Sequence, residues 1–169
     1  VCDYLLEKTG TDMDNISNEV EKLICYTEGK DIIAKEDVDA VVTIQVTGKI
    51  FQMMDAIGSK QQDRALSMYY DLLSVREKPS HILYLLMRHF NILLQVKEMA
   101  LKGYSPDRMA EYVEAPAFTI SKYAAQARNF TVNQLEEALR IAADTEEDIK
   151  TGNINDKIGV ELMIIGFSR

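Results

Sequence analysis

The sequence contains no tryptophan, only two cysteines and three prolines, and eight glycines that stand singly. Cys2 and Cys25 lie far apart and form no CxxC pair, so we interpret them as reduced thiols of a cytosolic protein. Because residues that interrupt helices are scarce and Leu, Ala, Met, Glu and Lys are frequent, the composition favours helix. No GxxxxGK motif followed by Ser or Thr occurs, which excludes a phosphate-binding loop of that kind.

The chain also lacks an excess of basic residues, since its formal net charge is −8. The first 42 positions hold four basic and eleven acidic side chains, whereas the rest of the chain is nearly neutral. This asymmetry indicates two bodies with different surroundings. Binding to nucleic acid requires a basic patch, and neither part has one, so strong independent binding is not predicted.

No pattern in the sequence predicts catalysis or a metal site. His81 and His89 are eight positions apart on one predicted helix, about 12 Å along its axis, which is too far to share a metal as neighbours. The acidic run 146–148 occupies consecutive helical positions that point in different directions, so a solvated acidic face is the better interpretation. We therefore predict no enzyme activity, no cofactor and no metal for this chain.

The longest apolar stretch, 81–101, lies between Pro79 and Gly103, which are expected at a helix start and stop. Apolar residues cover most of its circumference, as is typical of a helix buried on several sides. A membrane span is the competing interpretation, but Arg88 and Lys97 argue against it because charges are costly in hydrocarbon. We predict that this segment is the hub of a helical bundle and that the protein has no membrane partner.

Capping signals predict further helices around this hub. Ser105 is an N-cap followed by proline, Thr131 and Gln134 form a capping box, and Gly152 follows the last turn of that helix. No paired strands are evident, so the predicted fold class is all-α, a helical bundle. The predicted helices cover 1–8, the segment between Asp14 and Gly29, 35–42, 48–57, 60–75, 81–101, 106–113, 116–129, 132–150 and 156–167.

The β-branched run 42–47 is interpreted as an extended crossing between two domains. The helices before it are too few to bury a core alone, and they look like the end of a small helical domain that begins upstream. The sequence begins within a helical pattern, at Val1, and not with a methionine, which predicts a fragment of a longer protein. We place the two domains at 1–45 and 46–169.

Five segments carry a recognisable order of residues. The first reads Asp-Asn-Ile-Ser-Asn-Glu-Val-Glu-Lys-Leu, and the last, Asp-Ile-Lys-Thr-Gly, ends an amphipathic helix. The segments are 14–23, 33–38, 50–57, 126–130 and 148–152. In this order and spacing they resemble the C-terminal half of the delta subunits of bacterial DNA polymerase III, and the resemblance spans nearly the whole chain.

The resemblance implies a part of a clamp-loader subunit that serves DNA replication in the bacterial cytoplasm. Residues 1–45 would be the C-terminal part of an AAA+ lid-like helical domain. Residues 46–169 would be the collar, which in this family packs against the collars of other clamp-loader subunits in a five-membered ring. The family's delta subunit is not an ATPase. The sliding clamp would be contacted only by an N-terminal domain upstream of this chain, and contact with DNA would be weak or indirect.

Four residues in the matched segments are candidates for contact with other subunits: Gln126, Arg128, Lys150 and Thr151. Local roles are the alternative for two of them. Lys150 lies in the last turn of a predicted helix, where its charge complements the helix dipole. Arg128 is able to pair with nearby carboxylates or remain solvated.

Two other functions remain open at this point. A helical nucleic-acid-binding domain would depend on Lys97, Lys102, Lys122, Arg128 and Arg140, and its affinity would fall steeply with salt. An enzyme built from scattered tyrosines and carboxylates would require a pocket with several strongly perturbed titratable groups.

Overall fold

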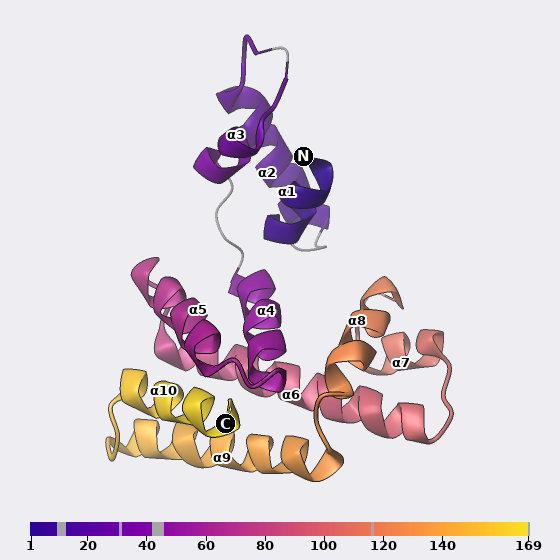
Figure 1. Ribbon diagram of the computed structural model, residues 1–169, viewed down its shortest axis with the longest axis vertical. Helices are drawn as coiled ribbons and strands as arrows, with labels where there is room; N and C mark the ends of the chain where they lie inside the picture. The colour runs from indigo at the N-terminus through magenta and orange to yellow at the C-terminus, as the bar shows by residue number, and fades with distance from the viewer. Residues whose placement is uncertain (10–12, 31, 42–45, 116, 169) are drawn as a thin grey trace. The chain divides into compact units, whose positions relative to one another are not determined.

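The computed structural model describes residues 1–9, 13–30, 32–41, 46–115 and 117–168. Every regular element in these ranges is a helix, so the predicted all-α fold is confirmed. In chain order the helices are α1 (Cys2–Thr9), α2 (Met13–Tyr26), α3 (Lys35–Val41), α4 (Val46–Gly58), α5 (Gln62–Ser74), α6 (Pro79–Leu101), α7 (Pro106–Tyr112), α8 (Ala117–Ala127), α9 (Val132–Thr151) and α10 (Asp156–Phe167) (Figure 1).

The chain divides into two compact units, 1–49 and 50–169. In the first unit, α1, α2 and α3 surround a small core in which Leu23 and Val38 are buried. The Ala34 amide donates a 2.9 Å hydrogen bond to Asp37, which stabilises the first turn of α3. Few apolar side chains are fully covered, as expected for a unit of this size.

The second unit is a bundle organised around α6, as predicted. This helix contacts α8, α9 and α10 (Figure 1). Apolar side chains are buried on several of its faces. Each fully buried aliphatic or aromatic side chain contributes about 1.5–3 kcal/mol. The buried residues of α6 are Ile82, Leu83, Leu86, His89, Phe90, Ile92, Leu93 and Val96.

The predicted helix ends are largely confirmed. The Thr131 hydroxyl accepts from the Gln134 amide at 3.1 Å while the Gln134 side chain accepts from the Thr131 amide at 2.8 Å, which completes the capping box of α9. Gly152 ends α9 in the left-handed conformation with φ of 78°. Asn155 caps α10 by accepting from the Lys157 amide at 3.1 Å.

Two long-range hydrogen bonds hold α10 at its two ends. The Tyr69 hydroxyl in α5 donates to the Lys157 carbonyl at 3.0 Å, and Lys60 Nζ donates to the Phe167 carbonyl at 3.2 Å. Along its length α10 packs closely on α9, because Gly159 has no side chain at the contact. A Cβ at that position would lie 3.2 Å from Thr145 Cγ2.

One expectation about the interdomain crossing is wrong. Val46 and Thr47 begin α4 instead of belonging to an extended segment. The division of the chain into two units falls between positions 49 and 50, within the residue range of this helix. The β-branched run favoured an extended segment, but β-propensity is a weak local signal that tertiary context overrides. The rest of the predicted crossing, 42–45, and position 116, where one of the predicted helices begins, lie outside the described residues.

Candidate interaction surface

Within the described residues, no group of three or more His, Cys, Asp or Glu side chains is arranged to hold a metal ion. In the same part of the chain, no helix is both long and apolar enough to cross a membrane. The remaining candidates for a functional site are polar clusters inside the bundle and apolar surface outside it.

One buried polar group in the bundle, the Gln126 amide, joins three helices. Its Nε2 donates to the Phe51 carbonyl at 2.9 Å and to Asp55 Oδ1 at 2.7 Å, both in α4. Because the nitrogen serves these two acceptors, Oε1 is the acceptor for His89 Nε2–H of α6, at 2.7 Å. Gln126 itself belongs to α8, so one side chain fixes α4 and α6 to α8.

His89 is held as a neutral ring in this cluster. It is 5% exposed, and burial lowers its pKa to about 4, with the Arg88 charge acting in the same direction and the Gln126 hydrogen bond opposing it. The His89 ring contacts the Phe51 ring edge-on, with 5.0 Å between the ring centroids, and its centroid lies 5.2 Å from that of Tyr123. Burial raises the pKa of the Tyr123 hydroxyl. The arrangement stabilises the packing of three helices.

The structure places the Gln126 side chain inside the bundle, and its predicted role at a subunit interface stays a prediction. Its side chain is 3% exposed and its amide is used entirely within the chain. The motif identified an important residue, but its orientation is set by the packing of α4, α6 and α8, which a linear motif does not contain. Within the folded chain, the Gln126 amide holds α4 and α6 to α8.

Arg128, Lys150 and Thr151 are exposed, but the fold does not bring them together. Arg128 follows α8, immediately before α9, whereas Lys150 and Thr151 end α9. With 20 residues, α9 is about 30 Å long and separates them by nearly that distance. Lys150 pairs with Glu146 at 2.9 Å, and the Thr151 hydroxyl donates to the Glu147 carbonyl at 2.8 Å. Their predicted contact with other subunits stays a prediction.

The basic residues proposed for nucleic-acid binding are partly engaged inside the chain. Lys97 Nζ donates to the Ala127 carbonyl at 2.8 Å and so closes the C-terminal end of α8. Arg140 bridges Glu137 and Asp144 at 2.6 and 3.2 Å. These contacts use two of the five side chains on which that alternative depends, so no observation favours it.

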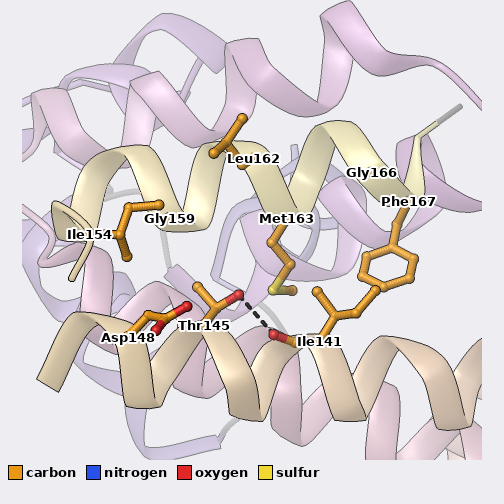
Figure 2. Close-up of a pocket in the computed structure, with 9 residues that line it drawn as sticks. All are labelled: Ile141, Thr145, Asp148, Ile154, Gly159, Leu162, Met163, Gly166 and Phe167. Atoms are coloured by element: carbon orange, nitrogen blue, oxygen red, sulfur yellow. Dashed lines mark hydrogen bonds between the residues drawn. The ribbon is translucent and has the colours of Figure 1, made fainter. Parts of the chain in front are cut away.

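A groove of about 300 Å³ runs between α9 and α10 on the surface of the bundle. Figure 2 shows Ile141, Thr145 and Asp148 of α9 facing Met163 and Phe167 of α10. The groove is mainly apolar, and Asp148 is the one titratable side chain in its lining. Its complete lining is Ile141, Thr145, Asp148, Ile154, Gly159, Leu162, Met163, Gly166 and Phe167.

The outward side of α10 continues this apolar surface. Ile158 and Leu162 are 52% and 54% exposed, although the helix carries apolar residues on nearly all sides. A helix of this composition is normally covered on every side. Sequence reasoning placed these residues in the last helix but did not identify a surface. The sequence signal that could have predicted this surface is the last helix itself, which has few charges and is apolar on nearly all sides.

Comparison with known proteins shows which proteins this chain is similar to. The family model of the DNA polymerase III delta subunit, C-terminal domain, matches residues 47–167. DNA polymerase III subunit delta of Bacillus subtilis (strain 168) is 25% identical over 164 residues, covering 97% of this chain and 47% of that protein. A probable DNA polymerase III subunit delta of Aquifex aeolicus (strain VF5) is 29% identical over 112 residues, covering 66% and 32% respectively.

A solved structure agrees with these matches. The Bacillus subtilis DNA clamp loader delta protein superimposes with a TM-score of 0.91 at 25% identity, covering 98% of this chain and 49% of that chain. The chain thus spans about half the length of these Bacillus subtilis relatives, and less of the Aquifex aeolicus protein.

The fold and the surface define the class of protein: an all-helical bundle with an apolar groove on its surface. The match to one family model over residues 47–167, most of the chain, identifies the family to which this bundle belongs. The chain belongs to the family of the C-terminal domain of the DNA polymerase III delta subunit. The resemblance found in the sequence is confirmed at this level.

Proposed function

We propose that this chain is the part of a clamp-loader delta subunit that holds the subunit in the clamp-loader assembly during DNA replication in the cytoplasm. The observation that carries the proposal is the family match over 47–167, which coincides with the helical bundle of the second unit. The chain's role is then association with other clamp-loader subunits. It contributes no catalytic group to the polymerase.

The two units receive different roles in this proposal. The bundle is the collar, which packs against the corresponding domains of its neighbours in a ring. The first unit is the end of an AAA+ lid-like domain. Contact with the sliding clamp belongs to the half of the relatives that this chain does not span, and DNA is approached only weakly or indirectly. The rigid packing around α6 supports the collar assignment, because an interaction domain must present surfaces of fixed geometry.

Co-purification with the other clamp-loader subunits of the source organism tests the proposal. The chain is mixed with the purified subunits and analysed by size-exclusion chromatography and sedimentation velocity. A stable complex with at least one of them is expected. If the folded chain enters no complex with any of them, the proposal fails. A parallel titration with DNA at low and high salt is expected to show weak binding at most.

A further inference from the structure

The outward face of α10 and the groove beside it form one apolar surface, which we call the α9–α10 face. It consists of Ile158 and Leu162 on α10 together with the residues that line the groove. The described part of the chain leaves the Ile158 and Leu162 side chains about half exposed, although both belong to a helix that is apolar on nearly all sides. Such a face is suited to a protein partner.

The groove has room for a side chain from outside. Apart from its chain neighbours and the backbone of its own helix, no atom lies within 4 Å of the position that a Cβ would occupy at Gly166, so the groove is open there. At Gly159, by contrast, the corresponding position is already closely approached by Thr145, Ile149 and Ile154. The two glycines of α10 therefore differ in role: one permits packing inside the chain, and the other leaves space on its surface.

The α9 side of this face is acidic. Glu137, Asp144 and Asp148 occupy the same side of α9 as the groove residue Ile141, at helical spacings of three and four. Arg140 pairs with Glu137 and Asp144. Asp148 is exposed and accepts a 3.1 Å hydrogen bond from the Asn153 amide. These three carboxylates outnumber the single Arg140 guanidinium, so this edge of α9, which we call the acidic rim, has a net negative charge.

We propose that the α9–α10 face docks an amphipathic helix whose apolar row enters the groove and whose flanking Lys or Arg side chains face the acidic rim of α9. The inference rests on the proposed function, in which this helix belongs to a neighbouring clamp-loader subunit. Charge complementarity selects this occupant. A second copy of the chain, joined through the same face, would place one acidic rim near another, which is unfavourable.

The experiment measures binding of the chain to the purified clamp-loader subunits of the source organism by surface plasmon resonance. Two variants alter the face without disturbing the core: Leu162→Gln makes its outer row polar, and Gly166→Leu fills the open groove. Each is expected to weaken binding at least about tenfold. The control Tyr112→Gln changes an exposed side chain on α7, outside the face, and is expected to stay within about twofold of the unaltered chain.

The acidic rim is tested through the association rate. Asp144→Asn combined with Asp148→Asn is expected to slow association about threefold or more at low salt, with the difference shrinking at about 0.3 M salt. Circular dichroism spectra and melting temperatures of all variants are compared with those of the unaltered chain, so that loss of binding is separated from loss of folding.

The outcomes separate the two proposals. If the unaltered chain binds no clamp-loader subunit, the proposed function and this inference both fail. If it binds, and folded Leu162→Gln and Gly166→Leu bind as well as Tyr112→Gln, the inference about the face is overturned while the proposed function stands. If Leu162→Gln instead abolishes self-association of the chain and leaves subunit binding intact, the occupant is a second copy and the inference is likewise overturned.

Discussion

Gln126 shows how one side chain determines the arrangement of a bundle. Its side-chain amide forms hydrogen bonds with a main-chain carbonyl and a carboxylate of α4 and with an imidazole of α6. Replacing it by Leu keeps most of the volume but leaves the buried His89 N–H and the Phe51 carbonyl without this partner. Each unsatisfied buried group costs about 1–3 kcal/mol.

We expect Gln126→Leu to lower the free energy of unfolding by about 2–4 kcal/mol, measured by urea denaturation. Gln95→Leu is the matched control, because Gln95 lies partly exposed on α6 and makes only a 3.4 Å hydrogen bond to Asn91. That variant is expected to change stability by less than about 0.5 kcal/mol. Equal effects of the two substitutions would contradict the central role of the Gln126 amide.

His89 makes the stability of the bundle dependent on pH. Its pKa in the folded chain is about 4, below the ordinary value of 6.5, so between these values the unfolded chain binds the proton more readily. Stability is therefore fully present above pH 6.5 and is lost as the pH falls toward 4, by up to about 3 kcal/mol from this group.

The test compares urea denaturation of the unaltered chain and of His89→Gln at several pH values from about 7 to about 5, where most carboxylates remain ionised. The His89→Gln variant is less stable at neutral pH because it disturbs the cluster, but its stability is expected to change less with pH over this range. If both proteins lose stability in parallel, His89 is not the group responsible.

At the scale of the helix, the two glycines of α10 give a matched pair of predictions. Gly166→Ala adds a methyl group in open space and improves helix propensity, so it is expected to leave stability unchanged or raise it by about 0.5 kcal/mol. Gly159→Ala places its Cβ 3.2 Å from Thr145 Cγ2, so the side chains that contact Gly159 must shift by a few tenths of an ångström. We expect it to be less stable than Gly166→Ala by about 1–3 kcal/mol in thermal unfolding. Equal melting temperatures of the two variants would show that the contact between Gly159 and Thr145 accommodates a methyl group without loss of stability.

Helices and their ends were predictable because their signals are local. The Thr131 capping box, Gly152 and the apolar circumference of α6 each depend on residues within a few turns of one another. The side-chain direction of Gln126 and the groove between α9 and α10 depend on how separate helices meet, so no local pattern contains them. Val46 and Thr47 were misassigned for the same reason, since propensity alone favoured a strand.

At the scale of the whole molecule, the two units differ in how much core they contain. Among the described residues, the buried apolar cluster of the first unit consists of Leu23 and Val38, whereas the second unit buries side chains from every helix between α5 and α10. Local unfolding is easiest where few apolar contacts are lost. Hydrogen exchange monitored by mass spectrometry is expected to be at least about tenfold faster in α2 and α3 than in α6. Equal protection would mean that both units open together.

The anchoring of α10 bears on how relatives of this protein diverge. Tyr69 and Lys60 both donate to main-chain carbonyls of α10, at Lys157 and Phe167. A carbonyl is present whatever side chain a residue carries, so these two attachments persist when the sequence of the helix changes. The outward positions of α10 can therefore accumulate substitutions that suit a changing neighbour while the helix keeps its place. A partner-facing surface could in this way evolve its specificity separately from the stability of the fold.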